Sequence, residues 1–178
     1  MKTKKILAIV FTILSVAVNA LIIVESFITG EGSSAQSIGF TKMIGDIIKV
    51  IFPNSYIAMD EEYLHGFIRK LFGHFLLFGV SGTLTTMALL ANIMTITKKK
   101  MFVYGGISIG FGFLLALFSE FIQSFTPGRA GMFTDVLIDF SGYLLFAVFV
   151  FFLLFVFSRN DFLNKEEKEN IDTKNENY

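Results

Sequence analysis

The chain has 178 residues, of which 53% are hydrophobic and only 17% are charged, and its formal net charge is zero. A water-soluble domain carries about 25% charged residues, so this composition excludes an ordinary soluble domain and favours a membrane protein. Cysteine is absent, which excludes disulfide scaffolds, thiolate metal sites and cysteine nucleophiles, and the balanced charge argues against a nucleic-acid-binding protein.

Four apolar stretches are each long enough to cross a bilayer, which takes about 20 helical residues. They span residues 6–28, 71–96, 102–125 and 133–157. Backbone polar groups in lipid must form hydrogen bonds within the segment, which favours helices. Apolar and polar residues do not alternate with a period of two, so the pattern does not indicate strands. The sequence therefore predicts an all-α, polytopic membrane helix bundle with four transmembrane helices.

The first stretch has two interpretations. Lys2, Lys4 and Lys5 resemble the basic start of a signal peptide, and Val18-Asn19-Ala20 passes for a weak cleavage site. However, the apolar run continues directly through residues 21–24. It is therefore longer than a signal peptide requires, and we favour an uncleaved membrane anchor.

The segment between the first two spans, residues 29–69, forms the first outer loop. We expect a flexible start at residues 30–34, followed by a short amphipathic helix lying on the outer membrane surface. Pro53 and Asn54 end this helix, and the acidic residues 60–62 open the next one. The charged residues that indicate the amphipathic helix by their spacing are Lys42, Asp46 and Lys49.

The basic residues predict the orientation. Ten of them fall on the side of the N-terminus and five on the other side. The strongest single indication of the orientation is the tight turn of lysines at 98–100. The positive-inside rule therefore places both termini in the cytoplasm. We expect a transmembrane domain over residues 1–158 and a charged, frayed cytoplasmic tail over residues 159–178.

Three spans have stripes of small and polar residues at helical spacing. Small residues allow close approach of membrane helices, and hydroxyl and amide groups can bond across the interface. We interpret most of these stripes as helix-packing surfaces. Their members are Thr12, Ser15, Asn19 and Ser26 on the first span, His74, Ser81, Thr85, Ala88 and Asn92 on the second, and Ser108, Gly112, Ala116 and Glu120 on the third.

Ionisable residues gather at the outer ends of spans two, three and four. A charge at the bilayer centre costs about 2.5–3.5 kcal/mol, so His74, Glu120 and Asp139 should face each other rather than lipid. Arg129, beyond the turn of residues 126–129, or Lys70 would supply the counter-charge. The sequence thus predicts an outward-opening polar pocket between these three spans.

The pocket residues fall into two expected roles. His74, Glu120 and Asp139 are the acid/base candidates for catalysis, since a histidine beside a carboxylate can transfer protons. The candidates for binding a substrate are Arg69, Lys70, Gln123, Arg129 and Asp135. Alternatively, the cluster is only an ion-pair lock between helices, Arg69 and Lys70 reach lipid phosphates, and Asp135 only caps its helix.

We expect no cofactor. The carboxylates and His74 could hold a divalent metal, but this is the less favoured possibility because no tight ligand spacing such as His-x-x-x-His is present.

Three ordered motifs resemble those of the VanZ-like family. They are Arg69-Lys70-Leu-Phe-Gly-His74-Phe75, Ser119-Glu120-Phe-Ile-Gln123-Ser-Phe-Thr-Pro127-Gly128-Arg129 and Asp135-Val-Leu-Ile-Asp139-Phe-Ser-Gly142. The likeness covers about residues 69–145. Asp139 departs from the family, which often has asparagine there, and so adds a second negative charge.

The resemblance implies a multi-pass protein of the bacterial plasma membrane, in a family named for reduced susceptibility to the lipoglycopeptide antibiotic teicoplanin. Its ligand would be an envelope glycolipid, a cell-wall precursor or such an antibiotic, alongside membrane lipids. Whether a reaction is catalysed stays open, as does the oligomeric state. A small transporter or lipid-translocating protein is one alternative, and a non-catalytic interaction subunit is another.

Overall fold

The computed structural model of the chain describes residues 2–52, 60–93 and 97–175, with side chains for all of these except 2, 98 and 157–175. The described stretches are helical and contain no strand. The elements are α1 (Lys2–Ser26), α2 (Gly30–Ile51), α4 (Glu61–Ile68), η1 (Arg69–Leu76), α5 (Leu77–Ala91), α6 (Lys98–Gln123) and α7 (Phe133–Asn175). This confirms the all-α prediction.

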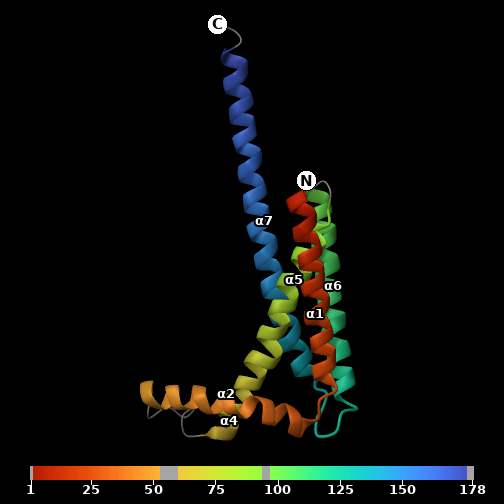
Figure 1. Cartoon of the computed structure of the whole chain (residues 1–178), viewed down its shortest axis with the longest axis vertical. Coiled ribbons are helices and arrows are strands. Elements are labelled where there is room, and N and C mark those ends of the chain that lie inside the picture. The colour runs from red at the N-terminus through yellow and green to blue at the C-terminus, as the bar shows by residue number, and fades with distance from the viewer. Residues whose placement is uncertain (1, 53–59, 94–96, 176–178) are drawn as a thin grey trace.

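Four helical segments are long and apolar enough to cross a membrane by length and composition, which confirms the number of predicted spans. They are Thr3–Ser26, Glu61–Ala91, Lys99–Gln123 and Phe133–Val156. They lie side by side as a bundle, and the start of α1 and the end of α7 lie at the same end of it (Figure 1). The two chain ends are therefore on one side of the bundle, as the sequence predicted.

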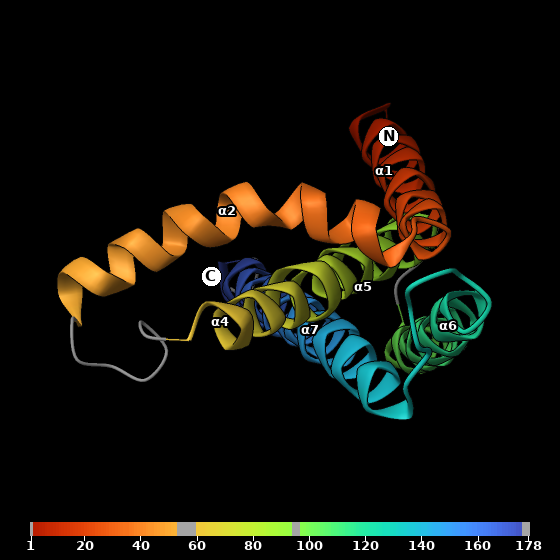
Figure 2. The same ribbon diagram turned by 90° about the horizontal axis from the view of Figure 1, so that it is seen from below.

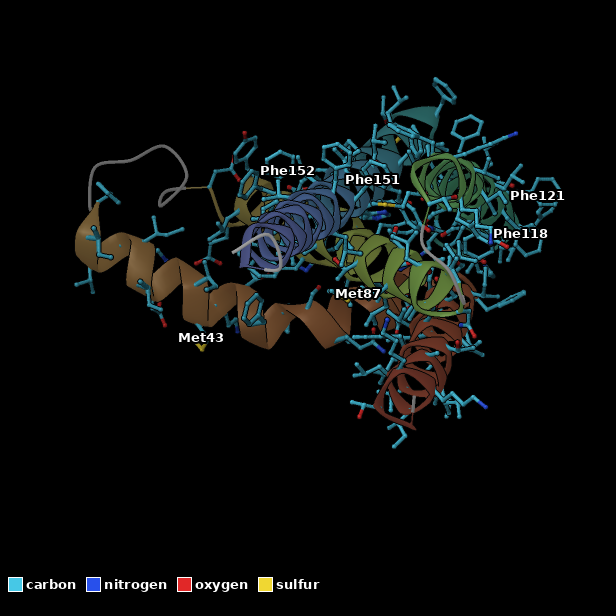
Figure 3. The ribbon with its side chains drawn as sticks, turned by 90° about the horizontal axis from the view of Figure 1, so that it is seen from above. Met43, Met87, Phe118, Phe121, Phe151 and Phe152 are labelled. Carbon is cyan, nitrogen blue, oxygen red and sulfur yellow. The ribbon has the colours of Figure 1, made fainter. Side chains whose placement is uncertain are left out.

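Many large apolar side chains lie on the outer surface of the bundle, whereas a soluble protein buries most of them in its core. The small core of the bundle centres on Ile22, Phe78 and Tyr143, which are at most 2% exposed. Large aromatic side chains instead point outward, among them Phe118 and Phe121 (Figure 3). An apolar outer surface of this extent suits contact with lipid chains.

Hydrogen bonds between the polar stripes confirm that they are packing surfaces. α1 bonds to α5 through Ser15 and Thr85, with 2.9 Å between their hydroxyl oxygens. Ser26 of α1 bonds to Ser119 of α6 at 2.8 Å. Such pairs satisfy polar groups that would otherwise face lipid. Further pairs are Asn92 with Thr12 and Thr86 with Ser108.

Helix α2 differs from the expected loop in length and in its start. It covers 22 residues and is not short, and residues 30–34 are its first turns and not a flexible segment. Thr29 caps it by accepting a hydrogen bond from the Gly32 amide at 3.2 Å, which supplies a partner for an otherwise free N–H. The helix ends at Ile51, and Pro53 and Asn54 lie outside the described residues.

The same helix crosses one end of the bundle. Figures 1 and 2 show α2 running from the end of α1 past α5 and α4, roughly across the direction of the spans. Its position at a membrane surface stays a prediction.

The second span begins at Glu61 and not near residue 71. Asp60 caps α4 by accepting from the Tyr63 amide at 2.9 Å, as the acidic residues predicted. From there α4, η1 and α5 form one continuous helical segment to Ala91. The predicted end near residue 96 lies outside the described residues.

Two further boundaries differ from prediction. The lysines at 98–100 start α6 instead of forming a tight turn, with Thr97 accepting a hydrogen bond from the Lys100 amide at 3.3 Å. Helix α7 continues to Asn175, through the tail that we expected to be frayed.

Candidate functional site

The segment that contains Arg69, Lys70 and His74 is π-helical. Hydrogen bonds from residue i to i+5 widen the turn beyond the 3.6 residues of an α-helix. Residues four apart, such as Lys70 and His74, therefore lie closer to one line along the helix. π-Helical turns inside α-helices are frequent at functional sites, and this eight-residue stretch, Arg69–Leu76, lies in the first half of the second span.

Lys70 and His74 pair with two aspartates that are also four residues apart, on the first turns of α7. The Lys70 ammonium nitrogen lies 2.8 Å from Asp135 Oδ1. His74 Nδ1 lies 3.0 Å from Asp139 Oδ1. Lys70 therefore supplies a counter-charge, as predicted, but to Asp135 and not to the three deeper residues.

His74, Glu120 and Asp139 meet between three elements, η1, α6 and α7, and we call them the acid–histidine cluster. One ligand atom of each lies within 4.8 Å of the other two, and His74 Nδ1 is 3.8 Å from Glu120 Oε1. Glu120 is 4% exposed and Asp139 is fully buried. The structure thus brings together the three residues that the sequence predicted to face one another.

The two carboxylates of the acid–histidine cluster differ in how they are bonded. Glu120 accepts a hydrogen bond at each oxygen, from the Gln123 side-chain amide at 2.9 Å and from the Met132 backbone amide at 3.0 Å. Asp139 Oδ1 faces His74, while its buried Oδ2 has no hydrogen-bond partner among the described residues. Glu120 is therefore held in place, whereas Asp139 retains an unused acceptor.

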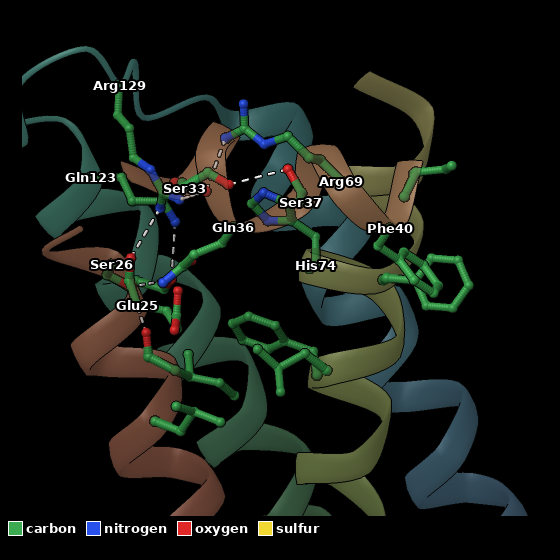
Figure 4. Close-up of a pocket in the computed structure, with 18 residues that line it drawn as sticks. Glu25, Ser26, Ser33, Gln36, Ser37, Phe40, Arg69, His74, Gln123 and Arg129 are labelled. Atoms are coloured by element: carbon green, nitrogen blue, oxygen red, sulfur yellow. Dashed lines mark hydrogen bonds between the residues drawn. The ribbon is translucent and has the colours of Figure 1, made fainter. Parts of the chain in front are cut away.

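Two arginines converge on a single hydroxyl at the start of α2. Arg129 Nη2 donates to Ser33 Oγ at 2.6 Å, and Arg69 Nη2 donates to the same oxygen at 3.4 Å (Figure 4). Arg129 also donates to the Glu25 carbonyl at 3.2 Å. Its Nε is buried and has no partner among the described residues. We call Arg69 and Arg129 the arginine pair and Ser33 their shared acceptor.

The arginine pair lacks a paired anion. Within the part of the chain that the structure describes, neither guanidinium forms an ion pair with a carboxylate. Burial lowers the pKa of Arg129 from its ordinary value, and the neighbouring charge of Arg69 acts in the same direction, while the Glu120 and Glu25 carboxylates oppose the shift. Two like charges at one site are unfavourable, so this site would gain from a bound anion. Arg129, the other predicted counter-charge, lies near enough to Glu120 for electrostatic attraction, but forms no ion pair with the acid–histidine cluster among the described residues.

A cavity of about 350 Å³ lies beneath the arginine pair (Figure 4). Its polar side includes His74, Gln123 and both arginines. Its apolar side is lined by Ile22, Phe40, Phe72, Leu77 and Phe78. A second cavity of about 230 Å³ adjoins the same four polar residues and adds Lys70 and Asp135. The pocket is therefore amphipathic, with cationic groups at one end of an apolar lining.

The turn of residues 126–129 is bonded to the end of α1 and the start of α2. The Gly30 amide donates to the Pro127 carbonyl at 3.0 Å, and Thr126 Oγ1 donates to the Ser26 carbonyl at 2.9 Å. Gly128 has φ +73°, a conformation that favours glycine. A Cβ on Gly30 would overlap the Gly128 carbonyl. The predicted turn is confirmed, and it holds the start of α2 against the bundle.

The sequence interpretation missed the contribution of α1 and α2 to the pocket. Ser33, Gln36 and Ser37 of α2 and Glu25 of α1 line the larger cavity. The spacing of Ser33 and Ser37, one helical turn apart, was an available signal.

Comparison with known proteins identifies a family. A family model described as VanZ/LLP1 matches residues 10–164, which is most of the chain and includes every residue of the acid–histidine cluster and the arginine pair. No curated protein and no solved structure matches.

Proposed function

The chain is a membrane protein that belongs to the VanZ/LLP1 family, and we propose that its pocket binds the anionic group of a membrane-embedded amphiphile. The observation that supports this most is the arginine pair. Arg69 and Arg129 point at one serine hydroxyl, and neither has an ion-pair partner among the residues that the structure describes. A phosphate or carboxylate could accept from both guanidinium groups, and charge-assisted bonds of this kind are the strongest in proteins.

The lining of the cavity indicates the rest of the ligand. Aromatic and aliphatic side chains such as Phe40, Phe72 and Phe78 continue directly from the cationic end. A headgroup held by Arg69 and Arg129 would leave its acyl or prenyl chain against this apolar side. We therefore propose a ligand that joins an anionic group to a hydrocarbon chain. Envelope precursors and teicoplanin-type lipoglycopeptides share this chemistry.

We further propose that this end of the bundle faces the outside of a bacterial plasma membrane, with both termini in the cytoplasm. The excess of basic residues on the side of the termini supports this orientation. It would place the pocket where cell-wall precursors and lipoglycopeptides meet the bilayer. His74, Glu120 and Asp139 lie beside the pocket, so a bound headgroup would be within reach of an acid/base pair.

The polar residues deeper in the bundle do not favour the transport alternative. Ser15 and Thr85, and likewise Thr86 and Ser108, are bonded to each other across helix interfaces. Hydroxyl groups that bond to one another in this way stabilise helix packing and are less available to bind an ion or a headgroup. We therefore propose binding, with or without a reaction, in preference to translocation.

The test uses the full chain in lipid nanodiscs and two separate probes, a polyprenyl phosphate and teicoplanin. Arg129→Lys and Arg69→Lys keep the charge but remove the planar guanidinium fork. Charge-assisted hydrogen bonds contribute about 1.5–3 kcal/mol, so we expect each variant to bind the true ligand about tenfold or more weakly. The matched control is Arg159→Lys, at the only other arginine of the chain.

The two probes separate the two ligand sources. Tighter binding of the prenyl phosphate indicates an envelope precursor, and tighter binding of teicoplanin indicates the antibiotic. Binding that is equal in Arg129→Lys, Arg69→Lys and Arg159→Lys would refute the proposed role of the arginine pair. Antibiotic susceptibility of cells with equal amounts of each variant gives an independent readout.

A further inference from the structure

We propose that His74, Glu120 and Asp139 form a site for one divalent transition-metal ion, of the kind that Zn²⁺ or Mn²⁺ would fill. Their ligand atoms lie within 4.8 Å of one another, and His74 Nδ1 is 3.0 Å from Asp139 Oδ1 and 3.8 Å from Glu120 Oε1. Ligands about 2.0–2.1 Å from a tetrahedral zinc ion are about 3.4 Å apart. The observed separations lie on both sides of that value.

The charge of the cluster is the first argument. Two carboxylates and one imidazole lie in a buried position between membrane-spanning helices. Lys70 pairs with Asp135, and neither Lys70 nor Arg129 forms an ion pair with Glu120 or Asp139 among the described residues. Buried charges without compensation cost several kcal/mol each. A divalent cation between Glu120 and Asp139 would balance both negative charges.

The hydrogen bonding is the second and independent argument. Asp139 is fully buried, and its Oδ2 has no hydrogen-bond partner among the described residues. A buried acceptor without a partner costs about 1–3 kcal/mol. A metal ion bound by Asp139 would supply the missing partner.

The surroundings of Glu120 resemble the outer shell of a metal site. The Gln123 amide and the Met132 backbone amide each donate to one Glu120 oxygen. Both bonds orient the carboxylate while leaving lone pairs free to bind a cation. Hydrogen bonds to ligating carboxylates commonly fix such sites.

The donor set indicates the class of metal. One imidazole nitrogen and two carboxylate oxygens suit zinc or manganese better than calcium, which takes six to eight oxygen ligands. Three protein ligands also leave a coordination position open, as in catalytic zinc sites. His74 lines both cavities together with Arg69 and Arg129, so an exogenous ligand could reach the ion.

The absence of a short ligand motif argued against a metal, but each of the three residues comes from a different helix. Ligands brought together by helix packing have no fixed spacing along the chain. The metal site does not depend on the proposed function of the arginine pair.

The test is a titration of the purified full chain, in detergent or nanodiscs and after treatment with a chelator, with Zn²⁺ and separately with Co²⁺. We expect one Zn²⁺ ion per chain and visible Co²⁺ absorption bands. His74→Ala and Asp139→Asn should weaken Zn²⁺ binding by about 100-fold or more, and Gln123→Ala by about tenfold. His65→Ala is the matched control, because His65 is the other histidine of the chain and bonds to Ser37 on α2.

Three results would overturn the proposal: no stoichiometric binding by the wild-type chain, equal binding by His74→Ala, or loss of binding in His65→Ala. If His74→Ala does not fold, Asp139→Asn and Glu120→Gln decide the question, since both preserve side-chain volume. No anionic ligand is added in this titration, so a failed metal site and a failed arginine site give different results.

Discussion

The Lys70–Asp135 and His74–Asp139 pairs have the same spacing on the same two helices but differ in burial, and we predict that they differ in coupling energy. The Lys70 and Asp135 side chains are 43% and 10% exposed, whereas those of His74 and Asp139 are 14% and 0% exposed. Exposed ion pairs contribute about 0.2–1 kcal/mol because water and salt screen them. Removing one partner of a buried pair costs about 3–5 kcal/mol because the other is left unpaired.

The prediction takes the form of two double-mutant cycles. For His74→Ala and Asp139→Ala we expect a coupling free energy of about 2–3 kcal/mol, near the upper end for residues in contact. For Lys70→Ala and Asp135→Ala we expect about 1 kcal/mol or less. Asp139→Asn should cost less than Asp139→Ala, because an amide oxygen can still accept from His74.

The assay is reversible unfolding of the full chain in mixed micelles with increasing denaturing detergent. A chelator in every sample keeps bound metal from adding to the free energy of unfolding. The Lys70–Asp135 cycle serves as the internal control, since it changes residues on the same helices one turn away. A coupling for His74–Asp139 that is equal to or below that for Lys70–Asp135 would refute the reasoning from burial.

Three further outcomes are expected. Ser33→Ala removes the hydroxyl that Arg129 and Arg69 share, so binding of the anionic ligand should change several-fold while the melting temperature moves little, and an unchanged affinity would contradict that role. Gly30→Val should detach the start of α2, because any Cβ there overlaps the Gly128 carbonyl; faster proteolysis within α2 would show this, and wild-type resistance would count against it. The chain has no cysteine, so single cysteines can report the orientation at two exposed positions, Glu31 and Lys100. An impermeant thiol reagent should label Glu31→Cys from outside the cell and Lys100→Cys from inside it. The opposite pattern would reverse the proposed orientation.

Some features of this protein follow from local sequence alone. The number of spans could be predicted because each requires only a sufficiently long apolar stretch, and a helix satisfies its own backbone groups in lipid. The meeting of His74, Glu120 and Asp139 could also be predicted, because ionisable groups at similar depth on neighbouring spans are costly in lipid and more stable together. The three ordered motifs likewise indicated the family that the match over residues 10–164 then showed.

The boundaries of the helices were less predictable. Helix α2 begins at Gly30, in a stretch rich in glycine and serine that is typical of a flexible loop. Its first turn is held by Thr29 and by the Pro127 carbonyl, which lies almost a hundred residues further along the chain. A contact of this kind has no signature in the local composition.

The partner of each basic side chain was decided only by the tertiary structure. From the sequence, Lys70 and Arg129 were equivalent counter-charges for the acidic residues. In the folded chain the π-helical turn aligns Lys70 with Asp135, while the docked turn of residues 126–129 directs Arg129 to Ser33 on α2. Apolar length and charge determine which segments cross the membrane and which end is polar, whereas the choice of partners depends on helix register and loop docking, which arise only when distant segments pack.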